Sequence, residues 1–385
     1  MKNYCLWFSL MFGMVECCTE QRVIDSPPPG FDPSGLIRFE TTSQAERHRA
    51  SLNKYIWPQG LPTTRPKVQS LMNVEELQGM RPDLIDHVDR LDVTVGDFDF
   101  STIAFRIFPR KPRRPAIRFI VHQGHVPDGP EHYLDAGVKE TVEYLLGQGC
   151  EVVAMQMPLV GWNHDSSGVY PGKAVFELGS RGTSGHRELF DLLEPHLEGQ
   201  TFRLFLEPIV QVINELSTVH ETEDQLHMIG LSGGGWATHM AAAVDTRIQY
   251  SIPVAGAMPL YARAFSPGSM GDTEQHHSLL YGEEDRNGDG VPETAAGVSS
   301  WLEIFALGTV GETQPRKQIQ VLNLYDSCCF SGEIYGTYAQ FLTEKVQTLA
   351  AGSWAVFIDQ SHREHLISRE ALETVVAPLL GKYKL

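Results

Sequence analysis

The sequence lacks three features that would place it in a specialised class of protein. After residue 18 no stretch reaches the roughly 18 continuous apolar residues that a membrane-spanning helix needs. Basic residues are outnumbered, 31 Lys and Arg against 48 Asp and Glu, for a net charge of −17. This argues against nucleic acid as a partner, because such binding depends on neutralised phosphates. Glycine and proline occur at ordinary levels, which excludes collagen-like and largely disordered chains. A globular protein with a sizeable core remains.

Cysteine is also scarce. Six cysteines in 385 residues do not make a disulfide scaffold. Three of them lie in the first eighteen residues, and no Cys-x-x-Cys pattern predicts a zinc or redox site. We expect the other three, Cys150, Cys328 and Cys329, to be isolated buried thiols.

The first eighteen residues differ from the rest of the chain. Lys2 precedes an apolar run over residues 4–15, which has the length of the hydrophobic part of a signal peptide. We therefore predict that residues 1–18 are a signal segment and that the protein is exported, to the periplasm or the extracellular space. The residues around Cys17 and Cys18 form neither a good cleavage site nor a good lipoprotein box. Lipid anchoring at one of them and a cytoplasmic protein with a frayed N-terminus stay as alternatives.

The remaining chain divides by composition and periodicity. Residues 19–87 are rich in proline, glycine and polar residues, and we predict an N-terminal extension that covers the main domain. The alternating segments 88–95 and 100–109 predict an antiparallel hairpin. From there to residue 385, short apolar strands alternate with helical patterns, apart from an irregular insertion at about 258–318. This pattern predicts an α/β fold, with a mostly parallel central sheet and helices on both faces.

One motif carries most of the chemistry. Gly230-Leu231-Ser232-Gly233-Gly234 is a G-x-S-x-G sequence that follows an apolar strand pattern and precedes a helical one. A sharp turn between that strand and helix would present the Ser232 hydroxyl at the carboxyl edge of the sheet. The helix N-terminus would favour an anion developing beside it. The alternative is a glycine-rich turn that contains an ordinary serine.

In this motif and the residues up to Ile248 the sequence resembles the α/β-hydrolase fold family. It looks closest to the dienelactone-hydrolase-like and acetyl-esterase-like branches, and the resemblance extends over about 88–385. The family implies a triad in the chain order nucleophile, acid, histidine. Ser232 then is the nucleophile, and elimination among the later aspartates leaves Asp326, at the end of a strand pattern, as the acid. His365 is preferred as the base because it directly precedes the last helix, and His362 is the alternative.

An oxyanion hole needs two N–H donors close to the nucleophile. The backbone N–H of Gly233 is the first. The second is expected from His122-Gln123-Gly124-His125, which resembles the family's His-Gly motif but contains an inserted glutamine. The donor is therefore Gln123 or Gly124, and either residue would otherwise simply line the turn.

A second motif lies in the insertion. Asp285-Arg286-Asn287-Gly288-Asp289-Gly290 has the oxygen ligands and the glycine of a calcium loop, but Ala296 stands where a bidentate glutamate belongs. A turn without metal is the main interpretation, and a looser calcium loop with Glu293 is the alternative. We assign no cofactor and no metal ligand to the catalytic site.

These observations predict a serine hydrolase that cleaves a carboxylic ester through an acyl-enzyme. The expected substrate is a small-molecule or glycan ester, and a neutral one because the net charge of −17 repels anions at long range. A peptidase or lipase on the same fold is the alternative among enzymes. A non-catalytic hydrolase-fold binding protein is the alternative from another class.

Overall fold

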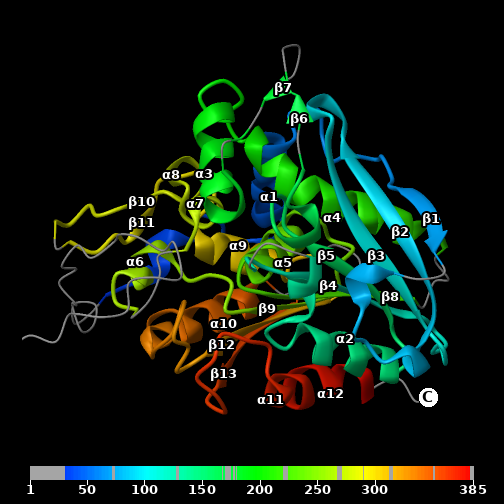
Figure 1. The fold of residues 1–385 in the computed structure, drawn as a ribbon. Coiled ribbons are helices and arrows are strands. Elements are labelled where there is room, and N and C mark those ends of the chain that lie inside the picture. The colour runs from blue at the N-terminus through cyan, green and yellow to red at the C-terminus, as the bar shows by residue number, and fades with distance from the viewer. Residues whose placement is uncertain are drawn as a thin grey trace, which may run out of the picture.

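The computed structural model describes residues 31–71, 74–126, 130–166, 168–169, 175–176, 178, 180–219, 224–266, 271–288, 290–311, 315–349 and 352–381 (Figure 1). The predicted signal segment and Asp289 of the candidate calcium loop lie outside these residues. In the described part of the chain, none of the helices has the length and apolar content needed to cross a bilayer.

A nine-stranded sheet forms the centre of the fold, in the order β1-β2-β3-β5-β4-β8-β9-β12-β13 (Figure 1). From β5 onward in this order neighbouring strands are parallel. The β1–β2, β2–β3 and β3–β5 pairs are antiparallel. The strands span Lys67–Leu71 (β1), Ile85–Val95 (β2), Phe100–Pro109 (β3), Ile117–Gln123 (β4), Glu151–Gln156 (β5), Gln225–Leu231 (β8), Tyr250–Val254 (β9), Arg316–Asn323 (β12) and Gly352–Asp359 (β13). The predicted mostly parallel sheet and the hairpin before it are confirmed.

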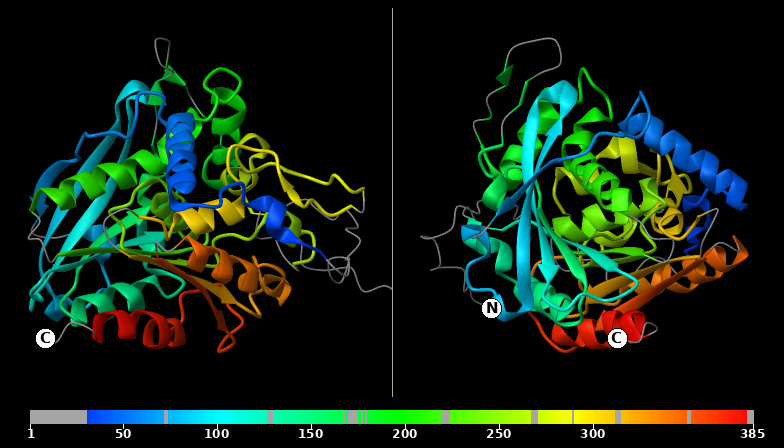
Figure 2. Two further views of the ribbon diagram at one scale, coloured as in Figure 1. Left: turned by 180° about the vertical axis from the view of Figure 1, so that it is seen from behind. Right: turned by 90° about the vertical axis from the view of Figure 1, so that its right-hand side faces the viewer.

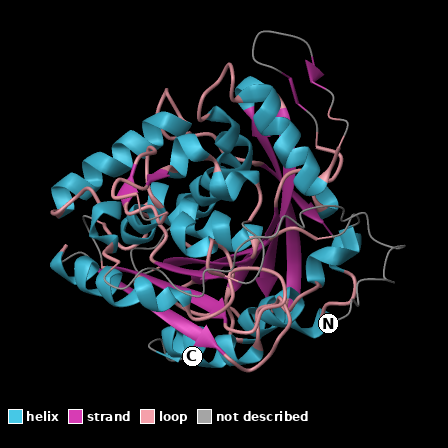
Figure 3. Cartoon of the chain, turned by 90° about the vertical axis from the view of Figure 1, so that its left-hand side faces the viewer, coloured by secondary structure: helices cyan, strands magenta, loops and turns pink. Residues whose placement is uncertain are grey.

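Helices cover both faces of this sheet (Figures 2 and 3). On one face α1, α3, α4, α5, α9 and α10 contribute to one apolar cluster, and on the other α2, α11 and α12 contribute to a second. The longer helices span Thr42–Ile56 (α1), Val138–Gly147 (α2), Gly182–Leu193 (α3), Arg203–Leu216 (α4), Gly233–Val244 (α5), Trp301–Leu307 (α9) and Ala339–Thr348 (α10). A π-helical turn, Leu372–Val376, joins α11 (Arg369–Ala371) to α12 (Ala377–Gly381). Because both faces are covered, every residue of β4 is buried, including the apolar residues Phe119, Ile120 and Val121 at its centre.

The insertion contains more regular structure than the sequence indicates. It holds three four-residue helices, α6 (Leu260–Arg263), α7 (Thr273–His276) and α8 (Ser278–Tyr281), and the longer α9. All seven residues of α9 are buried. Apart from Glu303 this helix is apolar on every side, so it lacks the amphipathic period by which a surface helix is recognised, and the expectation of an irregular insertion is wrong here.

The candidate calcium loop is the end of a small hairpin. Glu283–Glu284 (β10) pairs antiparallel with Thr294–Ala295 (β11). The carboxylate of Asp285 accepts the backbone N–H groups of Gly288 at 2.7 Å and Gly290 at 2.8 Å. Within the described residues, the Asp285 oxygens thus close a tight turn at the end of this hairpin. A further two-stranded pair joins β6 (Gly168–Val169) to β7 (Val175–Phe176).

The segment before β2, placed by sequence in the extension, is tied closely to the main body. β1 forms the edge strand of the sheet by pairing with β2. Arg38, which precedes β1 in the chain, faces Glu303 at the start of α9, and the Glu303 side chain is fully buried. Its two oxygens accept the Arg38 guanidinium at 2.9 and 2.7 Å, and Oε1 also accepts the Arg38 backbone N–H at 2.8 Å. Burial raises the pKa of Glu303, but hydrogen bonds from Arg38 and His48 outweigh it and lower the pKa to about 2.

Replacing Glu303 by glutamine is expected to lower the free energy of unfolding by about 2–4 kcal/mol, because Arg38 and His48 lose the charge that they face. Glu303 has a folded pKa below its ordinary value of 4.5, so it stabilises the protein above about pH 5 and this contribution is lost as the pH falls towards 2. Urea denaturation of both proteins at several pH values measures this. The exposed pair Arg369–Glu373 provides the control, since Glu373→Gln should leave the midpoint unchanged. Equal stability of wild type and Glu303→Gln at pH 7 would contradict the prediction.

Candidate active site

The carboxyl ends of four parallel strands bring the predicted site residues to one edge of the sheet. Ser232 follows β8 directly, and Gly124 follows β4. Asp326 lies three residues beyond β12, and His365 lies six residues beyond β13. Ends of parallel strands meet at the same edge, so residues far apart in sequence become neighbours there.

Ser232 sits in a strained turn between β8 and α5. Its backbone has φ 58° and ψ −122°, a conformation that residues other than glycine seldom adopt. The turn is held by hydrogen bonds from Ser232 N to Val254 O and from Trp236 N to Ser232 O, both 2.9 Å. A Cβ atom on Gly234 would collide with the carbonyl oxygen of His122. The glycine at this position of the motif is therefore required by the close approach of the β4 backbone.

Asp326 and His365 form a tightly bonded pair. The His365 Nδ1 atom lies 2.7 Å from Asp326 Oδ2. The other carboxylate oxygen, Oδ1, accepts the backbone N–H groups of Cys328 at 2.7 Å and Cys329 at 3.2 Å. Asp326 is buried, with 4% of its surface exposed. Because a carboxylate held by N–H donors acts as an acceptor, His365 Nδ1 carries the hydrogen and Nε2 keeps its lone pair.

The second ring nitrogen of His365, Nε2, lies on the side of the ring away from Asp326. It is buried and has no hydrogen-bond partner among the described residues. The alternative base, His362, lies elsewhere, with its Nε2 atom 3.4 Å from Asp359. The structure thus pairs His365, and not His362, with Asp326.

Cys328 and Cys329 form a disulfide between adjacent residues. The expectation of isolated thiols is wrong for these two residues, although Cys150 is a buried free thiol as expected. The chain turns tightly around the Asp326 carboxylate to deliver both backbone N–H groups, and this turn brings the two thiols together. The spacing of residues in the sequence does not show such a turn. A ring nitrogen of His365 lies within 4.8 Å of both sulfur atoms.

The two predicted sources of a second oxyanion donor behave differently. A Cβ atom on Gly124 would lie 2.6 Å from the backbone nitrogen of Gly233 and 2.8 Å from the Cβ of Ser232, so the Gly124 backbone packs directly on the turn. The Gln123 side chain instead donates to the carbonyl oxygens of Tyr133 and Asp135, at 3.3 and 3.1 Å. Its Oε1 atom accepts the Gly124 N–H at 3.0 Å. In this structure the Gly124 N–H therefore already donates to the Gln123 side chain.

Comparison with solved structures identifies the architecture. Acetyl xylan esterase 1 from Thermoanaerobacterium sp. JW/SL YS485 superimposes with a TM-score of 0.52 at 14% identity, over 91% of this chain and 98% of that one. A putative acetyl xylan esterase from Bacteroides fragilis NCTC 9343 gives 0.54 at 13% identity, over 93% and 92%. A promiscuous CE15 esterase from a marine bacterial metagenome gives 0.52 at 13% identity, over 89% and 91%. The chain has the α/β-hydrolase fold.

This confirms the fold expected from the resemblance in sequence. No protein-family model matches the chain, and no curated protein matches it in sequence. The similar structures are named as esterases, and at such low identity they establish the fold alone.

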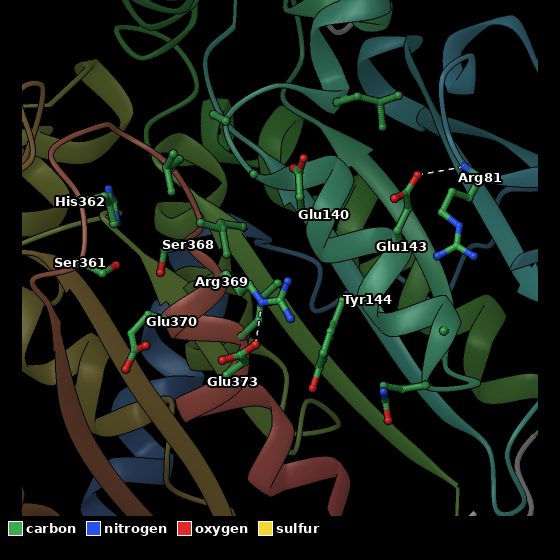
Figure 4. Close-up of a pocket in the computed structure, with 18 of the residues that line it drawn as sticks. Arg81, Glu140, Glu143, Tyr144, Ser361, His362, Ser368, Arg369, Glu370 and Glu373 are labelled. Atoms are coloured by element: carbon green, nitrogen blue, oxygen red, sulfur yellow. Dashed lines mark hydrogen bonds and ion pairs between the residues drawn. The ribbon is translucent and has the colours of Figure 1, made fainter.

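In this α/β-hydrolase fold one groove lies away from Ser232. It has a volume of about 1020 Å³ and runs between α2 and the C-terminal helices (Figure 4). His362 and Ser361 border it, together with the ion pair Arg369–Glu373, whereas Ser232 and His365 are not among its lining residues. A second groove of about 640 Å³ is bordered by Asp326, Tyr325 and Arg363.

A group of residues that the sequence does not reveal lies next to Gly233. A Cβ atom on Gly233 would lie 2.9 Å from Cε1 and 3.1 Å from Nδ1 of His125. His125 contacts His186 and Glu274, which come from α3 and α7. Burial lowers the pKa of His125, but Asp272 and Glu274 outweigh it and raise the pKa to about 10. Only the position of His125 beside the Gln-Gly sequence could have drawn attention to it, because nothing in the sequence marks the other two.

Proposed function

We propose that this protein is a serine hydrolase that cleaves a carboxylic ester through an acyl-enzyme, with Ser232 as nucleophile, His365 as base and Asp326 as acid. The observation that carries the proposal is the 2.7 Å contact between Asp326 and His365. It leaves a buried imidazole nitrogen with a lone pair at the sheet edge where Ser232 occupies a strained turn. This arrangement suits general-base activation of a hydroxyl.

In the proposed reaction Ser232 Oγ attacks the ester carbonyl carbon while His365 Nε2 takes the hydroxyl proton. The tetrahedral oxyanion is stabilised by the Gly233 N–H and the N-terminus of α5. The imidazolium is stabilised by Asp326 and passes its proton to the departing alcohol oxygen as the carbonyl re-forms. Water, deprotonated by the same nitrogen, then cleaves the acyl-enzyme to release the acid and restore the Ser232 hydroxyl.

For the substrate we propose a neutral ester, either a small molecule or an ester substituent on a glycan. Three of the structurally similar proteins are named as acetyl xylan or CE15 esterases, which supports an ester on a carbohydrate. The net charge of −17 supports a neutral substrate.

The test is a substrate panel with the purified protein and a Ser232→Ala variant as background. p-Nitrophenyl acetate, longer acyl esters, an acetylated glycan and a chromogenic peptide separate the alternatives. Turnover of short acyl esters that is absent in the variant supports an esterase, and acetate release from the glycan supports the glycan ester. Preference for long acyl chains indicates a lipase, and peptide cleavage indicates a peptidase. Hydrolysis of none of the four by folded protein would favour the binding-protein alternative.

The two histidines of the last loop give a sharper prediction. His365→Ala should lower kcat for p-nitrophenyl acetate by at least about 10³-fold, because the general base and the partner of Asp326 are lost. His362→Ala should leave kcat within about threefold of wild type, since His362 faces Asp359 instead. Steady-state kinetics on both variants measure kcat, once circular dichroism shows that both are folded like wild type. The reverse ranking would reassign the base to His362.

We also propose that the protein is exported. The disulfide between Cys328 and Cys329 supports this, because disulfides persist in oxidising compartments. Fractionation of producing cells should recover the protein outside the cytoplasm, and recovery in the cytoplasm alone would contradict export.

A further inference from the structure

Two histidines and a glutamate converge beside the turn that carries Ser232. His125 follows β4, His186 lies in α3 and Glu274 lies in α7, so three separate segments supply this cluster. His125 Nε2 is 3.0 Å from His186 Nδ1 and 3.1 Å from Glu274 Oε1. His186 Nδ1 is 3.5 Å from Glu274 Oε2. The side chains of His186 and Glu274 are fully buried.

The outer contacts of the two histidines fix where their hydrogens lie. His125 Nδ1 is 3.0 Å from a carboxylate oxygen of Asp272, and His186 Nε2 is 2.8 Å from the carbonyl oxygen of Pro158. A carboxylate and a carbonyl only accept hydrogen bonds, so each of these outer nitrogens carries a hydrogen. The facing nitrogens, His125 Nε2 and His186 Nδ1, point into the cluster, and a metal ion that takes the place of a proton there can bind the lone pairs of both.

Glu274 adds two more acceptors to the same space. Both of its carboxylate oxygens are buried, and they face His125 Nε2 at 3.1 Å and His186 Nδ1 at 3.5 Å. Two ring nitrogens and a carboxylate therefore face one another across one buried space. A buried carboxylate in that position costs several kcal/mol unless a cation lies close to it.

We propose that His125, His186 and Glu274 bind a divalent transition-metal ion, with zinc as the best match to this donor set. In a tetrahedral zinc site with bonds of about 2.0–2.1 Å the ligand atoms lie about 3.3 Å apart. The three separations in the cluster, 3.0, 3.1 and 3.5 Å, bracket that value. Asp272 and the Pro158 carbonyl are the outer acceptors that orient histidine ligands in such sites.

The ion could reach the site from solvent, and it would affect the neighbouring turn that carries Ser232. The His125 side chain is 15% exposed and that of Asp272 is 32% exposed, so this side of the cluster opens to solvent. His125 packs on Gly233, so a metal that fixes its ring also fixes the wall of the oxyanion hole. This positioning role rests on the proposed function, whereas binding of the metal does not.

The experiment measures metal directly on the full chain without an affinity tag. Mass spectrometry of the purified protein should find about one zinc per chain. After chelation and dialysis, zinc should restore a thermal midpoint higher by at least about 5 °C. Cobalt(II) added to the stripped protein should give the visible absorption of a tetrahedral site. A protein that binds none of these ions, or whose midpoint zinc does not raise, overturns the proposal and leaves protons as the cations of the cluster.

Variants locate the ion. Glu274→Gln should lower zinc affinity by at least about 100-fold, and Asp272→Asn by about 10–100-fold, measured by competition with a chromophoric chelator. Asp272 is partly exposed, so this second variant tests the site even where Glu274→Gln fails to fold. His239→Gln, at a buried histidine that hydrogen bonds Gln318 instead, is the control and should keep full metal content. Unchanged affinity in Asp272→Asn and Glu274→Gln would place any zinc elsewhere and overturn the assignment. Zinc binding without ester hydrolysis would overturn the proposed function alone.

Discussion

Alanine in place of Ser232 is expected to lower kcat for p-nitrophenyl acetate by at least about 10⁴-fold, to near the background rate. The hydroxyl is the only group in the proposed mechanism that forms a bond to the substrate, and no acyl-enzyme forms without it. Alanine retains the Cβ atom, so the strained turn and its hydrogen bonds are preserved. KM, where it remains measurable, should change little, and steady-state kinetics after removal of trace host esterases give both values.

Two controls separate lost chemistry from lost structure. Ser217→Ala, directly after α4, removes a hydroxyl that donates to the Ile213 carbonyl and should retain full activity. Ser232→Gly should be equally inactive yet more stable than wild type by about 1 kcal/mol, because glycine adopts a φ of 58° without strain. Activity in Ser232→Ala above a few per cent of wild type would remove Ser232 from the mechanism.

Asparagine in place of Asp326 is expected to lower kcat by about 10³–10⁴-fold with little change in KM. The carboxylate holds the hydrogen of His365 on Nδ1 and stabilises the imidazolium. An asparagine that turns its NH₂ group towards the histidine would favour the tautomer with hydrogen on Nε2, which cannot take a proton from Ser232. Turned the other way, the same NH₂ group would face the backbone N–H groups of Cys328 and Cys329.

Asp359 supplies the matched control, because it is a second buried carboxylate beside a histidine of the same loop. It accepts hydrogen bonds from Ser361 and Ser368 and lies 3.4 Å from His362. Asp359→Asn should therefore lower the thermal midpoint and leave kcat within about threefold. A larger loss of kcat in Asp359→Asn than in Asp326→Asn would exchange the two roles.

The sequence predicts the features that depend on neighbouring residues or on the order of strands along the chain. The motif around Ser232 predicts the turn because strand, glycines and helix are contiguous. The chain order that the family resemblance implies, together with the strand pattern before it, predicts Asp326, and both it and Ser232 follow parallel strands of one sheet. The choice of His365 over His362 rested on its place before the last helix, and the structure shows the contact with Asp326.

The remaining features depend on contacts that no local pattern records. The disulfide between Cys328 and Cys329 requires a particular turn around the Asp326 carboxylate. The cluster of His125, His186 and Glu274 forms only when α3 and α7 pack against the end of β4. Neither segment has a ligand spacing of its own, so no local pattern in the sequence predicts this cluster.

The measurement that tests the central claim most directly is labelling with a fluorophosphonate probe, followed by mass spectrometry of the digested protein. Such probes react with a serine hydroxyl that a neighbouring base activates, so the result does not depend on knowing the natural substrate. The account predicts a single adduct on the peptide that contains Ser232, with labelling much slowed in His365→Ala and unaffected in His362→Ala. Folded wild-type protein that gains no adduct, or that carries it on a different serine, would contradict the account.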